Sequence, residues 1–117
     1  MSDKLSLEQK IALLAGADTW HTAAFPGAGV PAIRTSDGPA GVRGTSYTGP
    51  ASASFPCGAA LGASFDVELV RRVGEALGRE ARSKSVHVLL APTVNLHRTP
   101  LGGRNFECFS EDPVLTA

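Results

Sequence analysis

The sequence lacks the features that would direct it to nucleic acid, to a membrane or to export. Its 11 basic and 11 acidic residues cancel, so no net electrostatic field favours a nucleic acid or an anionic membrane as a partner. No hydrophobic run approaches the ~20 residues that a membrane span needs. The N-terminus leads into a charged helix instead of the apolar core of a secretory signal. We therefore expect a cytoplasmic protein with no nucleic-acid or membrane partner.

Cysteine and histidine are scarce, and their spacing excludes the common metal sites. Cys57 and Cys108 lie far apart, and in a protein without an export signal we expect them to be reduced and buried rather than joined. His21, His87 and His97 share no metal-ligand spacing. The chain also lacks the Gly-x-x-x-x-Gly-Lys pattern of a phosphate-binding loop. The sequence thus predicts no metal, no bound nucleotide and no cofactor.

What is present is the composition of an ordinary globular protein. Hydrophobic residues make up 43% and charged residues 19% of the 117 positions, which suits one small domain. Thirteen glycines and eight prolines are many for this length, and most of them fall between Gly16 and Pro56. We expect this stretch to be loop-like, which is unusual in a compact domain unless the loop is functional or packs against something else.

Two amphipathic helices are predicted. Ser6 and Gln9 have the spacing of a capping box, and Gly16 supplies a stop after the first helix. A second helix is expected from Asp66 to residues 84–85, with exposed ion pairs between Glu68 and Arg72 and between Glu75 and Arg79. The expected apolar stripes are Leu7, Ile11 and Leu14 on the first helix, and Val70, Val73 and Leu77 on the second.

Two strands complete the predicted elements. Residues 32–34 indicate a brief strand, and the continuous apolar run of residues 86–91 indicates a strand buried on both faces, as in a parallel sheet covered by helices. Pro92 ends this second strand, and Asp112-Pro113 starts a further helix after a long polar loop. This order of strand, loop and helix is typical of an α/β fold.

Asp37 is the first candidate for a binding residue. It lies in Ser-Asp-Gly-Pro, directly after the first expected strand. Its carboxylate could accept hydrogen bonds from a polyhydroxylated ligand at the carboxyl end of a barrel strand. Alternatively, Asp37 forms an Asx-turn, which the residue pattern taken alone favours.

Further candidates lie in the polar loop and near the first helix. Arg104 follows two glycines and could present its donors to sugar hydroxyls, or it could pair with Glu107; both can hold at once. Arg98 is expected to tie the loop down by hydrogen bonds to carbonyl groups. Trp20 offers either a stacking face beside a sugar or a plug for the end of a core.

Taken in order, several segments resemble the N-terminal part of a glycoside hydrolase family 3 β-glucosidase. These segments are Leu7–Gly16, Trp20–Thr22, Ser36–Arg43, Phe55–Gly58, Asn95–Glu107 and Phe109–Pro113. Each is weakly specific by itself, whereas the combination is highly specific. The resemblance runs from about Leu5 to the end of the chain.

The resemblance implies a fold and a substrate. Residues 1–117 would be the N-terminal portion of a (β/α)8 barrel domain, incomplete in this sequence, and an α/β sandwich would follow it. The family hydrolyses terminal, non-reducing β-linked glucosyl residues with retention of configuration, so the expected substrate is a β-linked glucoside or short oligosaccharide. By position, Asp37 and Arg104 match the sugar-binding aspartate and arginine of the family, and Arg43 matches a position near the sugar pocket.

No catalytic residue is expected within this chain. Retaining hydrolysis needs two carboxyl groups roughly 5 Å apart. The resemblance gives Asp37 a binding role, makes Glu107 a support for Arg104, and places the nucleophile and the acid/base beyond residue 117. The expected partner is therefore the rest of the same polypeptide, without which the chain should be inactive. The alternatives are another family 3 specificity, such as β-xylosidase, and a short non-catalytic protein that binds a sugar or a partner.

Overall fold

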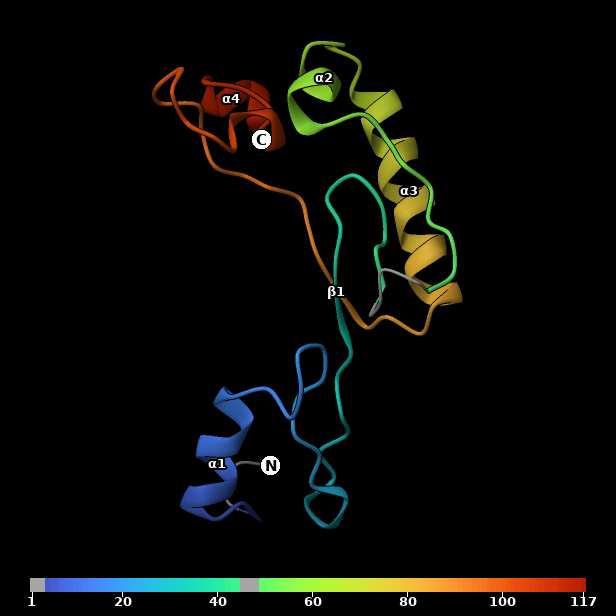
Figure 1. Cartoon of the computed structure of the whole chain (residues 1–117), viewed down its shortest axis with the longest axis vertical. Helices are drawn as coiled ribbons and strands as arrows, with labels where there is room; N and C mark the ends of the chain where they lie inside the picture. The colour runs from blue at the N-terminus through green and yellow to red at the C-terminus, as the bar shows by residue number, and fades with distance from the viewer. Residues whose placement is uncertain (1–3, 45–48) are drawn as a thin grey trace.

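Two strands and one long helix organise the computed structural model, which describes residues 4–44 and 49–117. Strand β1 (Thr35–Asp37) pairs in parallel with β2 (Val88–Leu90), so that Asp37 lies opposite Leu90. Helix α3 (Val67–Ser83) connects the two strands and runs along one side of them (Figure 1). The other elements are α1 (Leu7–Leu14), α2 (Gly58–Gly62), α4 (Pro113–Thr116) and the 3-10 helices η2 (Pro26–Ala28) and η3 (Asn105–Glu107). The predicted α/β arrangement is confirmed.

The core lies between α3 and the sheet. Val73, Leu77 and Ala81 of α3 are buried against Val42, Leu61 and Val86. The N-cap of α3 is Asp66, whose carboxylate accepts a hydrogen bond from the backbone N–H of Leu69 at 2.9 Å. The predicted start and apolar stripe of this helix are thus confirmed.

The predicted surface ion pairs of α3 are wrong. Arg71, and not Arg72 or Arg79, bonds to both Glu68 and Glu75. Arg71 stands three residues after one carboxylate and four before the other, so a single guanidinium reaches both along the same helix face. Which of several adjacent arginines takes the carboxylates depends on rotamers that the spacing does not specify.

The first strand begins later than predicted. The residues expected to form it, 32–34, lie before β1. Ile33 is bonded to Thr22 instead: the Ile33 carbonyl accepts from the Thr22 N–H at 3.0 Å, and the Ile33 N–H donates to the Thr22 hydroxyl at 2.9 Å. The second strand is confirmed but shorter than residues 86–91. It is not buried on both faces: Val88 and Leu90 are exposed, since the sheet has two strands and α3 covers one side.

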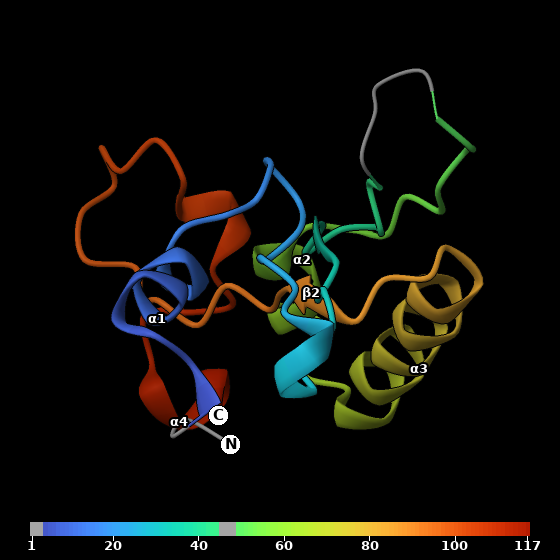
Figure 2. The ribbon, with the colours of Figure 1, turned by 90° about the horizontal axis from the view of Figure 1, so that it is seen from below.

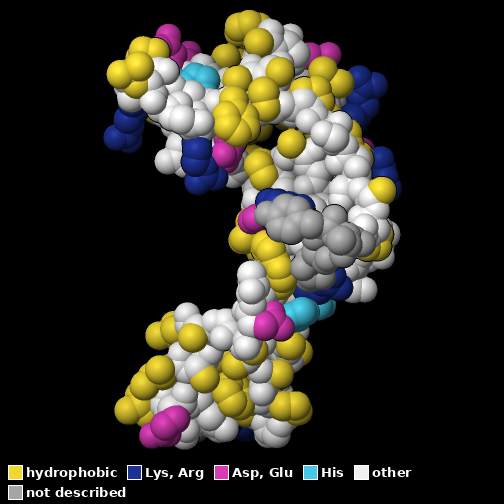
Figure 3. Space-filling model, viewed as in Figure 1, with side chains coloured by type: hydrophobic (Ala, Val, Ile, Leu, Met, Phe, Trp, Pro, Cys, Tyr) yellow, Lys and Arg dark blue, Asp and Glu magenta, His cyan; other side chains and the backbone are white. Residues whose placement is uncertain are grey.

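Helix α1 forms as predicted, and its capping box is present. The Ser6 hydroxyl accepts from the Gln9 N–H at 3.2 Å, and the Gln9 side-chain oxygen accepts from the Ser6 N–H at 2.9 Å. Its apolar stripe is nevertheless exposed, with Leu14 91% accessible. The helix lies at one end of the long axis (Figure 1), where hydrophobic side chains gather on the surface (Figure 3).

The molecule is more open than a compact domain of its length. Its radius of gyration is 17.3 Å, whereas about 13 Å is typical of 117 residues. Its accessible surface is 8013 Å², against about 6000 Å² for a compact monomer of this mass. Within the described residues from Gly16 to Pro56, η2 and β1 are the regular elements, as the predicted loop-like stretch requires.

The cysteines are free thiols, as predicted. Cys108 is buried, whereas Cys57 is only half-buried. Among the residues that the structure describes, no helix is long and apolar enough to cross a membrane.

Candidate functional site

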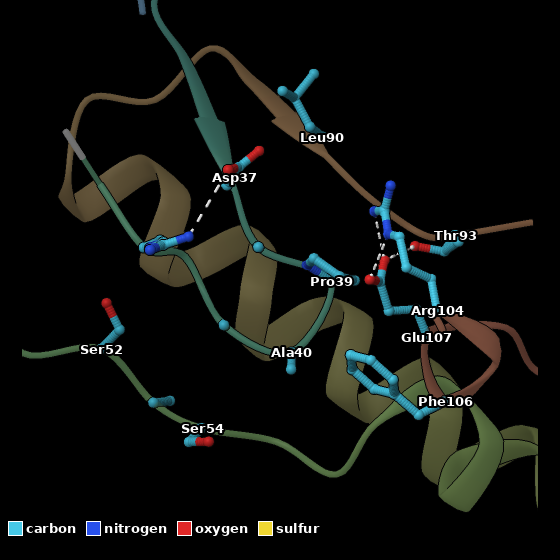
Figure 4. A pocket seen from close by; sticks show the side chains of 14 residues that line it. Asp37, Pro39, Ala40, Ser52, Ser54, Leu90, Thr93, Arg104, Phe106 and Glu107 are labelled. Carbon is cyan, nitrogen blue, oxygen red and sulfur yellow. Dashed lines mark hydrogen bonds and ion pairs between the residues drawn. The ribbon is translucent and has the colours of Figure 1, made fainter. Parts of the chain in front are cut away.

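A cavity of about 600 Å³ opens where β1 and β2 end (Figure 4). The turn after β1 forms one part of its lining, residues 52–54 form another, and the polar loop after β2 forms the third. The lining includes the three residues predicted to bind a sugar, Asp37, Arg43 and Arg104, together with Glu107. The fold therefore brings together candidates that are separated by as many as 70 positions in the sequence.

Asp37 reaches the cavity because the chain turns sharply after β1. Gly38 has a φ of +143°, and a Cβ there would lie 1.6 Å from the carbonyl oxygen of Gly41, so a side chain is excluded. The turn returns Arg43 to Asp37: its N–H donates to the Asp37 carbonyl at 3.0 Å, and its Nη1 lies 3.9 Å from Asp37 Oδ2.

The Asx-turn alternative for Asp37 does not fit this turn. Such a turn needs a hydrogen bond from the backbone N–H two residues on, and that residue is Pro39, which has no N–H. Among the described residues, no backbone N–H donates to the Asp37 carboxylate. The carboxylate is half exposed at the cavity, so its oxygens are accessible to a ligand.

Arg104 and Glu107 form the expected pair within the single turn of η3. Arg104 Nε and Nη2 each lie 2.7 Å from one oxygen of Glu107, a bidentate contact. The pair is asymmetric, because the Arg104 side chain is 81% exposed and that of Glu107 is 14% exposed. Thr93 adds a longer contact to the carboxylate, 3.4 Å from Oε2. Glu107 thus holds the guanidinium, which remains accessible from the cavity.

The charges of this pair stabilise each other. The hydrogen bond from Arg104 holds the pKa of Glu107 below its usual value, against a smaller opposing effect of burial. The same bond, and after it the charge of Glu107, raises the pKa of Arg104; the carboxylate of Asp37 contributes in the same direction. At neutral pH Glu107 is therefore ionised and has no proton to donate.

His97, and not Arg98, ties down the polar loop. His97 Nε2 lies 2.7 Å from the carbonyl oxygen of Asn105 and 3.0 Å from that of Cys108, and since a carbonyl can only accept, this nitrogen carries the proton. Arg98 is exposed, and its side chain makes no hydrogen bond to the described residues. The loop-tying role predicted for Arg98 is therefore wrong. The sequence shows that His97 and Arg98 both precede the loop, but it does not predict which of the two side chains points inward.

Trp20 lies away from the cavity. It lines a separate shallow depression with Asp18, His21 and Arg34, and its carbonyl accepts from the Thr35 N–H at 2.7 Å. The structure thus does not bring the indole to the three sugar-binding candidates. Among the residues that the structure describes, the aromatic ring that lines the cavity is Phe106, 57% exposed, which the sequence reasoning missed. Its position in the sequence, two residues after Arg104, could have indicated that Phe106 lies near the same cavity.

The chemistry of the cavity is that of paired carboxylates and guanidiniums. Carboxylate oxygens accept hydrogen bonds and guanidiniums donate them, which suits a ligand that carries several hydroxyl groups. Within the described part of the chain, no group of three or more His, Cys, Asp and Glu residues could hold a metal ion.

Comparison with known proteins identifies the family. The model of the glycosyl hydrolase family 3 N-terminal domain matches residues 7–117. The chain belongs to glycosyl hydrolase family 3. The resemblance inferred from the sequence segments is thereby confirmed.

The relatives of this family 3 chain are named as β-glucosidases. It is 59% identical over 114 residues to "Probable beta-glucosidase J" of Aspergillus fumigatus, covering 97% of this chain and 13% of that protein. It is 56% identical over 117 residues to the β-glucosidase of Rhizobium radiobacter, covering 98% of this chain and 14% of that one. The chain therefore spans about one seventh of the length of these relatives.

Solved family 3 structures share the fold of the chain. The crystal structure of the β-glucosidase from Kluyveromyces marxianus in complex with glucose superimposes with a TM-score of 0.91 at 45% identity. The match covers 97% of this chain and 14% of that one. The open arrangement of α1, the sheet and α3 is thus also the arrangement of this segment in a solved β-glucosidase.

Proposed function

We propose that this chain supplies part of the sugar-binding subsite of a β-glucosidase that hydrolyses terminal, non-reducing β-glucosyl residues with retention. Asp37 accepts hydrogen bonds from sugar hydroxyls, Arg104 donates to them, and Arg43 orients Asp37. The observation that carries the proposal is the convergence of these three residues on one cavity. The names of the relatives, and the glucose bound by the Kluyveromyces marxianus enzyme, support glucose as the sugar.

The finer fold is part of the proposal. In a (β/α)8 barrel, ligands bind at the carboxyl ends of the parallel strands. The cavity lies at that end of β1 and β2, and the α3 crossover supplies the first strand–helix–strand unit. A barrel would also add neighbours to β2, whose Val88 and Leu90 are exposed here.

Bond cleavage is assigned to residues outside this chain. One carboxyl group must attack the sugar and another must protonate the leaving oxygen. Glu107 is ionised and engaged with Arg104, so it cannot be the acid, and Asp37 is assigned to the hydroxyls. The nucleophile and the acid/base would then come from the remainder of a family 3 polypeptide.

A chimera tests the proposal. These 117 residues would replace the matching segment of the Rhizobium radiobacter β-glucosidase, and Asp37→Ala would be introduced there. Each hydrogen bond to a charged group contributes about 1.5–3 kcal/mol, so two such bonds predict a loss in kcat/KM of roughly two to four orders of magnitude on an aryl β-glucoside. Glu111→Ala, which removes an exposed carboxylate outside the cavity, should leave kcat/KM unchanged.

Deoxy-glucosides separate sugar binding from turn formation. A substrate that lacks the hydroxyl held by Asp37 should lose much less on Asp37→Ala, because the partner is already absent. Equal losses for normal and deoxygenated substrates would mean that Asp37 only shapes its turn. A chimera that prefers β-xylosides would point to the other family 3 specificity, and one that binds glucose without turnover would point to a non-catalytic binding protein.

A further inference from the structure

A largely buried lysine ties the back of the cavity to helix α3. Lys84, the C-cap residue of α3, has a side chain only 11% exposed. Its Nζ lies 2.8 Å from the carbonyl oxygen of Val42, 3.0 Å from Glu80 Oε1 and within hydrogen-bond distance of the Ser52 hydroxyl. An ammonium group has three donors, and here each of them has an acceptor.

Glu80 extends the same network one turn earlier on the helix. Its side chain is 17% exposed, and Oε1 also accepts from the backbone N–H of Ala53 at 3.1 Å. Burial disfavours the charged form of Glu80, but the bonds from Lys84 and Ala53 outweigh it and hold the pKa below its usual value. Glu80 is therefore ionised at neutral pH, and the two side chains are bonded to two separate stretches of backbone.

Those two stretches form one wall of the cavity. The wall consists of residues 40–43 and 52–54, of which Val42 alone is absent from the cavity lining. The stretches also contact each other, because the Ser52 hydroxyl donates to the Val42 carbonyl and a Cβ on Gly41 would lie 2.0 Å from the Ala53 oxygen. Lys84 thus fixes the carbonyl group of Val42, the residue immediately before Arg43. The guanidinium of Arg43 lies beside Asp37.

Stability alone does not account for an ion pair in this place. Replacing a buried pair by apolar residues is often neutral or stabilising, because both charges must be desolvated. What an ammonium and a carboxylate add is direction, since each bond specifies where one backbone group lies. The backbone groups specified here belong to the wall that carries Arg43.

We propose that Lys84 and Glu80 are positioning residues for the sugar cavity, holding residues 40–43 and 52–54 so that Arg43 stays beside Asp37. The inference rests on the proposed function, because it takes the cavity as the sugar site. Neither residue lines the cavity, so both act through the wall.

The chimera provides the test, with glucose as competitive inhibitor. Lys84→Met keeps the aliphatic stem and removes the donors. We expect the inhibition constant of glucose and the KM of the aryl glucoside to rise about tenfold, because the sugar would lose the equivalent of about one hydrogen bond to a charged group. The value of kcat should change by less than about threefold. Glu80→Gln should act in the same direction, and the double variant should add little, because both residues serve one network.

Arg71→Met is the matched control. It also removes a cation of α3 that is paired with a glutamate four residues away, but on the exposed face. It should leave both constants unchanged. A purely structural role for Lys84 would lower the melting temperature without moving the inhibition constant of glucose.

The outcomes separate the two proposals. If Asp37→Ala weakens glucose binding and Lys84→Met does not, the positioning role is wrong and the sugar site stands. If neither variant changes glucose binding, the sugar site itself is wrong. Should Lys84→Met fail to fold, Glu80→Gln decides, since its amide keeps the shape but removes the charge that pairs with Lys84; an unchanged inhibition constant would then overturn the positioning role.

Discussion

Helices α1 and α3 begin with the same kind of local signal but end in different environments. Each has a side-chain N-cap, Ser6 in one and Asp66 in the other, and each carries an apolar stripe at helical spacing. In α3 the stripe is buried, with Leu77 9% exposed, whereas in α1 Leu7 is 68% and Leu14 91% exposed. Figure 1 shows α3 beside the strands and α1 at the far end of the molecule, and the view from below in Figure 2 shows the two helices on opposite sides of β2.

The difference teaches what an amphipathic pattern does and does not specify. A stripe shows that one face of a helix needs an apolar partner, but it does not say which segment provides one. Helix α3 meets Val42, Leu61 and Val86, all brought in by its own strand–helix–strand unit. The stripe of α1 has no comparable cover among the described residues. The chain spans 13% of the length of the Aspergillus fumigatus relative.

The largest expected effect comes from truncating one leucine in each stripe. In the 117-residue chain, Leu77→Ala should cost about 2–5 kcal/mol because it opens a cavity in the core, whereas Leu14→Ala should cost less than about 0.5 kcal/mol at its exposed site. The measurement is the opening free energy of the α3 and α1 amides from hydrogen exchange. Similar costs at the two sites would mean that α1 is covered in solution.

Removing the N-caps should have an intermediate effect. Ser6→Ala and Asp66→Ala each remove a side-chain acceptor, at a cost of about 0.5–2 kcal/mol. A short, unpacked helix is marginal in water, so Ser6→Ala should abolish amide protection in α1, while α3 keeps most of its protection through packing. Surviving protection of α1 in the Ser6→Ala variant would contradict the view that its caps, and not its contacts, maintain it.

The smallest expected effect is the pH dependence of the Arg104–Glu107 pair, which lies in the part of the molecule that carries the cavity. Arg104 lowers the pKa of Glu107 from its ordinary 4.5, so the stabilisation from this pair is fully present above pH 4.5 and is lost as the pH falls through the lowered pKa. Titration of the Glu107 carboxyl by NMR should show this lowering, and Arg104→Gln should return the pKa toward 4.5. An unshifted pKa in the unsubstituted chain would mean that the pair does not persist in solution.

Much of the candidate site could be named from the sequence but not assembled from it. Asp37 and Arg104 were candidates from their residue patterns, the resemblance added Arg43, and the Arg104–Glu107 pair followed from the closeness of the two residues in the sequence. The sequence pattern taken alone favoured an Asx-turn for Asp37, although Pro39 cannot donate the required bond. Phe106 and the role of His97 were missed, because burial and side-chain direction in an irregular loop have no periodic signal.

By itself, the sequence determined the helix caps and the buried helix face, which depend on residues within about four positions of one another. These include the capping box at Ser6–Gln9, the start of α3 at Asp66 and the stripe that α3 buries, because caps and helical faces are local geometry. The family also follows from the order of short segments.

Only the tertiary structure decided what depends on distant partners. It placed the start of β1 at Thr35, since Ile33 is bonded to Thr22, and it left the stripe of α1 exposed. It also brought Lys84 to Val42, 42 positions away, and so tied the wall of the cavity to α3. The physical reason is that a hydrogen bond or an apolar contact acts over a few ångströms of space, and only the folded chain decides which distant residues come that close.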